Sequence, residues 1–214
     1  MKNVQELLKK YEERKDEIKS RLKEFREVFS EDEKRIFSEL AFCLCTPQSS
    51  AKGAWTAISA LNNNNFLFSG DETQVRPFLN TVRFNENKSR HIVAARKMFT
   101  DSGEIKIKEK LLKFGNDQPG MREWLAENVM GLGMKEASHF LRNIGLGGEL
   151  AILDRHILKN LQEYGAIEEI PKTLTEKKYL EIEQQMKDFA KKAGIPFDEL
   201  DLLLWAEETG FIFK

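Results

Sequence analysis

The sequence predicts an all-α fold, and two features of its pattern indicate this. Apolar residues recur every three or four positions along most of the chain, and no segment alternates apolar and polar residues as a half-buried strand does. The chain has 214 residues, of which 41% are hydrophobic and 32% charged, so it can bury a core beneath a well-solvated surface.

Polar breaks in the apolar pattern divide the chain into its helices. Residues 30–33 have the composition of a capping box for the second helix, and Asp154 is placed to cap a later one. Residues 46–50 and 62–65 read as loops. The expected helices cover residues 4–29, 88–99, 105–114, 121–129, 135–144, 155–164, 175–193 and 198–208, with two more carrying residues 36–42 and 55–61.

Charge and cysteine content limit the classes of function. The formal net charge of −1 excludes a protein that coats DNA through a global positive field, so any nucleic-acid site must be a local patch. Cys43 and Cys45 are too few for a four-thiolate iron–sulfur cluster, and we expect them to be reduced. The charged N-terminal residues do not form a signal peptide, and no apolar run is long enough to span a membrane, so we expect a cytoplasmic protein.

The run Gly131-Leu132-Gly133-Met134-Lys135 combines a tight turn with the start of a helix. Two glycines permit such a turn, and the free amides and positive dipole end of the helix suit one phosphate group. An ordinary helix–helix turn can also contain two glycines. The hydrophobic Val129 before the turn and the position of Lys135 two residues after Gly133 favour the functional interpretation.

Lys135 and Asp154 are the candidate catalytic pair. A lysine amine attacks only after losing its proton, and a helix N-terminus with partial burial favours the neutral amine. A fixed carboxylate such as that of Asp154 stabilises the positive charge that develops on a sugar as its glycosidic bond breaks. The alternatives are a surface lysine in a Lys-rich chain and a plain helix cap, although capping and catalysis by Asp154 are compatible.

This pattern resembles the helix-hairpin-helix DNA glycosylases, whose motif ends in a catalytic Asp, and Lys135 is similar to the nucleophile of the bifunctional branch. The resemblance implies one all-α unit of two lobes over residues 1–214, with the hairpin motif at about 124–144 and no iron–sulfur cluster. It implies no cofactor and no catalytic metal, but it permits a monovalent cation at the hairpin carbonyls.

The apolar, aromatic C-terminal region is the second informative feature. It resembles the second class of 8-oxoguanine DNA glycosylases, found in archaea and some thermophilic bacteria, and this resemblance implies that Trp205 and Lys214 recognise the base. An indole face suits a flipped purine, and a carboxylate can accept hydrogen bonds from guanine. Asp201, one helical turn before Trp205, is a third candidate, and a core role is the alternative for Trp205.

The remaining expected DNA contacts rest on the same resemblance. A glycosylase flips its target nucleotide out of the duplex, and Gln48 lies where relatives carry the loop that fills the vacated stack, with a plain surface loop as the alternative. His156 is expected to touch the DNA backbone, with a partly buried helix histidine as the alternative. Lys88 and Arg90 are candidate phosphate contacts, although a solvated helix start explains each of them better when taken singly.

The predicted function is therefore that of a bifunctional DNA glycosylase/AP lyase that excises 8-oxoguanine, with Lys135 forming a Schiff base at C1′ before β-elimination of the 3′ phosphate. The expected partner is double-stranded DNA containing oxidised guanine, and the protein is expected to be a monomer at a prokaryotic nucleoid. Two alternatives stay open: a glycosylase for another oxidised base, similar to endonuclease III, and a non-catalytic helix-hairpin-helix module that binds DNA.

Overall fold

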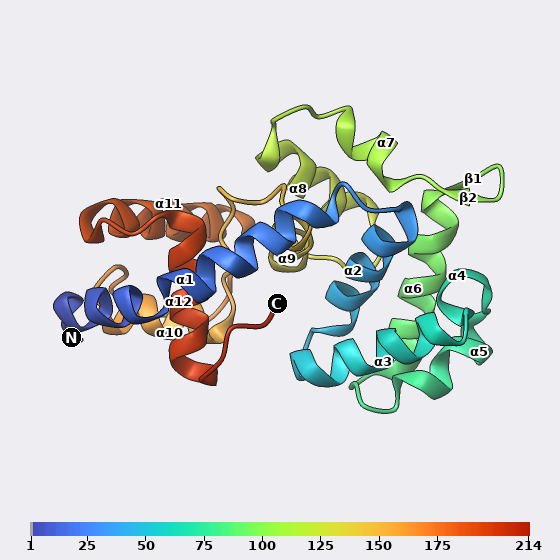
Figure 1. Ribbon diagram of the computed structural model, residues 1–214, viewed down its shortest axis with the longest axis horizontal. Helices are drawn as coiled ribbons and strands as arrows, with labels where there is room; N and C mark the ends of the chain where they lie inside the picture. Colours follow the sequence, from blue (N-terminus) through green and yellow to red (C-terminus); the bar gives the residue numbers. More distant parts are fainter. Residues whose placement is uncertain (1) are drawn as a thin grey trace. The chain divides into compact units, whose positions relative to one another are not determined.

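The computed structural model describes residues 2–214, and it confirms the predicted all-α class (Figure 1). Within these residues, no helix is long and apolar enough to cross a membrane. The elements are α1 (Val4–Val28), α2 (Glu33–Cys45), α3 (Ala51–Asn63), α4 (Phe66–Ser69), α5 (Glu72–Val75), the 3-10 helix η1 (Arg76–Leu79), α6 (Asn85–Phe99), β1 (Thr100–Asp101), β2 (Glu104–Ile105), α7 (Ile107–Leu112), α8 (Gln118–Asn128), α9 (Met134–Asn143), α10 (Arg155–Glu163), α11 (Glu176–Ala193) and α12 (Phe197–Thr209).

The chain divides into two compact units. Unit 1 contains the chain up to Arg26 together with Gly148–Lys214, and unit 2 contains Glu27–Gly147. Most of α1 and all of α10 to α12 therefore belong to unit 1, whereas α2 to α9 belong to unit 2. The glycine hairpin and Lys135 lie in unit 2, and Asp154 lies in unit 1.

Helix α2 forms the centre of unit 2. Every residue from Ile36 to Cys45 is buried, and the helix packs against α3, α6 and α9. A helix that is apolar around most of its circumference must lie inside a core. Cys43 and Cys45 are both buried, and burial raises the pKa of the Cys45 thiol to about 12. Both cysteines are therefore core residues, and the raised pKa makes Cys45 an unreactive thiol.

A buried polar link connects α2 to α9. The Asn143 side chain donates to Glu39 Oε2 at 3.1 Å and accepts from Arg142 Nη2 at 3.2 Å. Glu39 is fully buried and also pairs with Arg35 one turn earlier on α2. A buried carboxylate is tolerated only when it is paired and hydrogen-bonded. This link therefore fixes where the second helix of the hairpin lies on α2.

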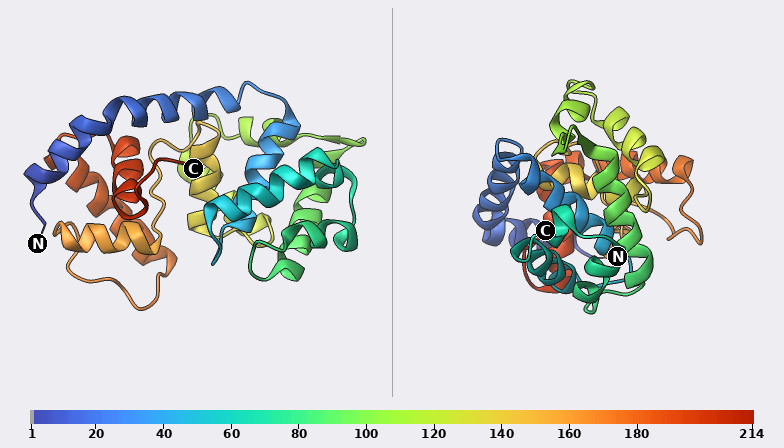
Figure 2. Two further views of the ribbon diagram at one scale, coloured as in Figure 1. Left: turned by 60° about the horizontal axis from the view of Figure 1, so that its bottom comes forward. Right: turned by 90° about the vertical axis from the view of Figure 1, so that its right-hand side faces the viewer.

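Unit 1 is built around α12, which packs against both α10 and α11 (Figure 2). Polar contacts attach α1 to the same helix. Tyr11 donates its hydroxyl to Glu199 Oε2 at 2.7 Å, and Arg26 pairs with Asp198 at 3.2 Å. Leu7 and Ile18, on the apolar face of α1, are fully buried.

The start of α2 differs from the expected capping box at residues 30–33. The cap is Asp32, whose side chain accepts from the Arg35 amide. Glu33 turns away to a different helix and accepts from the Ile107 and Lys108 amides at 2.8 and 3.2 Å, at the start of α7. A capping box needs its glutamate to reach back to its own helix, and here a tertiary contact takes that carboxylate instead.

The other differences are short elements. Helices α4 and α5 and the 3-10 helix η1 fall within residues 66–79, where the sequence pattern predicted no helix. The two-residue strands β1 and β2 pair antiparallel through a turn at Ser102 and Gly103, both with positive φ. Such a turn matches the twist of a two-stranded ribbon. Elements this short hold too few residues to show a period.

Candidate active site

The hairpin turn joins α8 to α9 in unit 2. Val129 and Leu132 are buried, and the Leu132 amide donates to the Val129 carbonyl at 3.0 Å. Gly131 has a φ of +87°, which is the left-handed conformation that glycine adopts without strain. The buried side chains of Val129 and Leu132 anchor the turn in the core. The first amides of α9 have no acceptor within the helix, as at the start of any α-helix.

Lys135 is the second residue of α9, which begins one residue before the expected helix of residues 135–144. Its Nζ pairs with Glu136 Oε1 at 2.9 Å, and its side chain is 28% exposed. The second oxygen of Glu136 accepts from the Gly133 amide at 3.3 Å. Glu136 therefore connects the turn to the candidate nucleophile, a role that the sequence pattern did not reveal.

His91, on α6, packs directly against the turn. A Cβ placed on Gly131 would lie 2.2 Å from His91 Nδ1, so the imidazole occupies the space that any other side chain would need. Burial lowers the pKa of His91, and the cations Lys88 and Arg90 lower it further. A neutral imidazole therefore lies against the hairpin at neutral pH. No local motif marks His91, because the contact spans 40 residues of chain.

Asp154 caps α10 in unit 1. Its Oδ1 accepts from the His156 and Ile157 amides, both at 2.8 Å. The preceding extended segment is held by α11: Glu183 accepts from the Ala151 amide at 2.7 Å, and Tyr179 donates to the Ala151 carbonyl at 2.6 Å. These two buried side chains fix the backbone that leads to Asp154, and sequence reasoning did not identify them.

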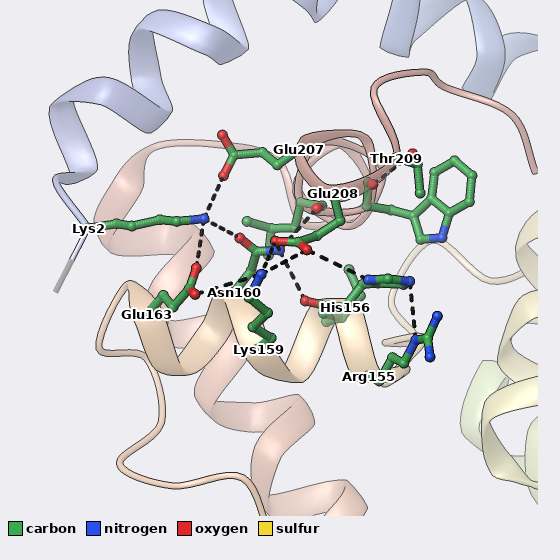
Figure 3. Close-up of polar contacts among 12 residues, drawn as sticks. Lys2, Arg155, His156, Lys159, Asn160, Glu163, Glu207, Glu208 and Thr209 are labelled. Atoms are coloured by element: carbon green, nitrogen blue, oxygen red, sulfur yellow. Dashed lines mark hydrogen bonds and ion pairs between the residues drawn. The ribbon is translucent and has the colours of Figure 1, made fainter.

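His156 follows Asp154 on α10, and its two ring nitrogens face different partners (Figure 3). Nδ1 lies 3.8 Å from Glu208 Oε2, and Nε2 accepts from Arg155 Nε at 3.4 Å. Glu208 also accepts from Lys159 at 2.9 and 3.0 Å, and this hydrogen bond lowers the pKa of the Glu208 carboxyl. His156 is partly exposed, and Glu208 of α12 lies beside its ring.

The base-binding candidates all lie on α12 or beyond it. Trp205 is partly buried, and its ring meets Phe211 edge-on, with centroids 5.4 Å apart. The chain turns back at Gly210, where φ is +81°, and Thr209 donates to carbonyls on both sides of this turn. The structure places Asp201 inside unit 1, only 3% exposed, whereas Lys214 is partly exposed.

Gln48 is exposed at the tip of the loop between α2 and α3, with a φ of +55°. Lys88, one of the two candidate phosphate contacts in its segment, is not solvated: it is buried and donates to oxygen atoms of this loop. Arg90 is exposed, but Glu86 accepts from it at 2.7 Å. The unexpected burial of Lys88 arises from these loop acceptors, which the sequence cannot reveal.

The predicted site residues therefore separate into two groups. Unit 2 brings together the hairpin, Lys135 and the partners of the turn. Unit 1 brings together Asp154, His156 and the helix that carries Trp205. A glycine hairpin followed by a lysine, together with an aspartate that caps a later helix, defines the helix-hairpin-helix class of DNA glycosylases.

Comparison with known proteins identifies the family. The model of the 8-oxoguanine DNA glycosylase family matches residues 18–195, and this protein belongs to that family. A protein of Fusobacterium nucleatum, named 8-oxoguanine DNA glycosylase/AP lyase, is 47% identical over 213 residues, which cover 98% of this chain and 96% of that protein. A protein of Methanocaldococcus jannaschii with the same name is 36% identical over 214 residues, covering 100% of this chain and 99% of that protein.

Solved structures agree with this assignment. The 8-oxoguanine DNA glycosylase of Thermotoga maritima has a TM-score of 0.87 and 33% identity, covering 99% of this chain and 98% of that one. The Methanocaldococcus jannaschii 8-oxoguanine glycosylase/lyase in complex with DNA containing 8-oxoguanine has a TM-score of 0.85 and 34% identity, covering 97% of this chain and 99% of that one. The family, fold class and enzyme class predicted from the sequence are confirmed: the protein is a DNA glycosylase with AP lyase activity.

The contact between His91 and Gly131 gives a test of the turn. Gly131→Ala is expected to lower the free energy of unfolding by more than the roughly 1–2 kcal/mol of a left-handed alanine, because the new Cβ also meets the imidazole. Gly103→Ala is the matched control, since Gly103 has a φ of +85° and open space around it. Urea unfolding measures both costs. Adding His91→Ala should recover part of the loss, and equal costs for the two single variants would contradict the proposed contact.

Proposed function

We propose that this protein excises 8-oxoguanine from duplex DNA and then cleaves the strand at the abasic site, with Lys135 as the nucleophile. The observation that carries the proposal is the position of Lys135, at the start of α9 behind a turn held by buried side chains. Lys135 is partly exposed, so a nucleotide can reach its amine. Membership of a family of glycosylase/lyases supplies the reaction class.

The proposed chemistry has two steps. The neutral amine of Lys135 attacks C1′ of the deoxyribose, the bond from C1′ to N9 breaks, and the base leaves with a proton. Asp154 stabilises the positive charge that develops on the sugar. The sugar ring then opens as the C1′–O4′ bond breaks and O4′ takes up a proton, which leaves a Schiff base between Lys135 and C1′. This Schiff base loses a proton from C2′, and the 3′ phosphate departs by β-elimination. The proposal requires that Lys135 and Asp154 act on the same nucleotide when DNA is bound.

The proposed DNA contacts follow the geometry of each unit. The amides at the start of α9, behind Gly131 and Gly133, bind one phosphate, because they are free donors at a positive helix end. Gln48 occupies the gap left by the flipped nucleotide, since it is exposed at a loop tip. His156 contacts the DNA backbone. We further propose that the protein acts as a monomer in the prokaryotic cytoplasm, at the nucleoid, with a monovalent cation at the hairpin carbonyls.

The proposed base pocket lies on α12 and the residues after it. Trp205 offers an indole face for stacking, and its edge-on contact with Phe211 fixes the ring. Lys214 is proposed to contact the base because it is partly exposed beyond this aromatic pair. Asp201 is the weaker candidate, since this residue of α12 is only 3% exposed.

Borohydride trapping tests the nucleophile. A covalent complex with 8-oxoguanine duplex is expected for the native chain and absent for Lys135→Gln, whose strand cleavage should fall by at least about a thousand-fold. Lys113→Gln is a control, because Lys113 is an exposed lysine of the same unit. Trapping that persists in Lys135→Gln would exclude this residue as the nucleophile.

Asp154 can be tested with its capping role held constant. In Asp154→Asn the side-chain oxygen can still accept from the amides of α10, so stability should change little, whereas excision should fall roughly 100- to 1,000-fold as the charge is lost. Asp154→Ala should lose about 1 kcal/mol of stability as well. Asp32→Asn, at the cap of α2, is the control. Normal single-turnover excision by Asp154→Asn would remove the carboxylate from the mechanism.

If Lys214 contacts only the flipped base, its loss should affect excision of 8-oxoguanine but not the binding of undamaged DNA. Deleting Lys214 should slow single-turnover excision of 8-oxoguanine, while the affinity for undamaged duplex stays unchanged, because only the flipped base reaches this pocket. Lys191→Ala, an exposed site on α11, is the control. A panel of lesions, each paired with every candidate base, shows which substrate is affected. Unchanged excision of 8-oxoguanine would remove Lys214 from the pocket.

A further inference from the structure

Lys88 is an unusual lysine, because its side chain is almost completely buried. Only 4% of the residue is exposed, although it lies near the start of α6, where a solvated cation would be expected. Burying an ammonium group is costly unless hydrogen bonds replace its water. Burial lowers the pKa of Lys88, and the nearby cations Lys135 and Arg83 contribute to this. The cost of keeping a lysine here must therefore be offset by specific contacts.

Those contacts lie at the last residue of α2 and in the loop that follows it, which carries Gln48. Lys88 Nζ donates to the Cys45 carbonyl at 2.6 Å, to the Pro47 carbonyl at 2.8 Å and to Ser49 Oγ at 2.9 Å. Three acceptors require three donors, and only the ammonium form of lysine supplies three. The three oxygen atoms surround Gln48 in the sequence, so the cation holds both ends of the loop tip.

The loop tip is strained, which explains why it needs this anchor. Gln48 has a φ of +55°, a conformation that costs a residue with a side chain about 1–2 kcal/mol. Strain of this kind persists only when the surroundings over-determine the backbone. Ser49 adds a second link, since its Oγ accepts from the Arg83 amide at 2.9 Å. The loop is therefore held in one shape, with the Gln48 side chain exposed, before any DNA arrives.

We infer that Lys88 is a positioning residue for duplex opening: it holds the loop of residues 46–50 so that Gln48 can enter the space left by the flipped nucleotide. The inference rests on the proposed function of Gln48. Lys88 itself does not touch DNA, because it is buried beneath the loop. A preorganised loop loses less entropy when Gln48 enters the duplex. This advantage matters only where the target base must first be extracted from a paired stack.

The test compares two substrates in single-turnover excision. One carries 8-oxoguanine paired with cytosine, and the other carries the same lesion opposite an abasic analogue, where no partner base is left behind. Lys88→Met should slow excision on the order of 10- to 100-fold on the paired duplex and change it little on the unpaired lesion. Lys97→Met, an exposed lysine on the same helix, is the control.

A purely structural role predicts a different pattern, because a destabilised protein loses excision on both substrates alike. Equal losses for Lys88→Met, or no loss on the paired duplex, would overturn the inference. Ser49→Ala removes one of the three acceptors and serves if Lys88→Met does not fold; it should show a smaller loss with the same substrate dependence. If the native chain excises neither lesion, the proposed function fails instead.

A double-variant cycle tests the route through Gln48. If Lys88 acts by placing this side chain, then Lys88→Met should cost much less in a Gln48→Ala background than in the native chain. Additive losses would mean that Lys88 acts on excision by another route, and they would overturn the inference as stated.

Discussion

The hydrogen bond between Asn143 and the buried Glu39 is the contact on which the candidate site of unit 2 depends. It attaches α9 to α2, the buried helix against which α3 and α6 also pack. These helices carry, or directly follow, the hairpin, the Gln48 loop and Lys88. Because interiors are densely packed, a shift of α9 on α2 would move the amine of Lys135 relative to all of them. The buried contact between Asn143 and Glu39 thus fixes where the Lys135 amine lies in unit 2.

Asp154 depends on a separate set of constraints in unit 1. Tyr179 and Glu183 of α11 hold the extended segment before it, and the first amides of α10 hold its carboxylate. One carboxylate can both cap a helix and stabilise a developing cation. Both capping amides of α10 donate to Oδ1 of Asp154, so the cap does not use Oδ2. The cap also prevents the side chain from rotating freely. The cap therefore gives the Asp154 carboxylate the fixed position that its proposed role in catalysis requires.

The sequence predicted the features that depend on local rules. The turn at Gly131, the position of Lys135 and the cap at Asp154 each follow from a few adjacent residues, and so do the long helices. The missed features are tertiary: Lys88 is charged and was expected at the surface or on a phosphate, yet distant loop oxygens make its burial favourable. The imidazole of His91 fills the space beside Gly131 for the same reason. No spacing in the sequence encodes contacts between residues 40 positions apart.

Lys88 and Lys135 belong to the same unit, and the charge of one influences the other, but their environments suit opposite tasks. Lys135 has one partly solvated ion pair, and pairs of this kind are typically worth about 0–1 kcal/mol, so its amine can leave Glu136 at little cost. Lys88 would lose one buried and two partly buried hydrogen bonds by moving, and each buried acceptor left unsatisfied costs about 1–3 kcal/mol. Burial therefore distinguishes Lys135, which must change its partner in the proposed mechanism, from Lys88, which must keep its partners in the inferred positioning role.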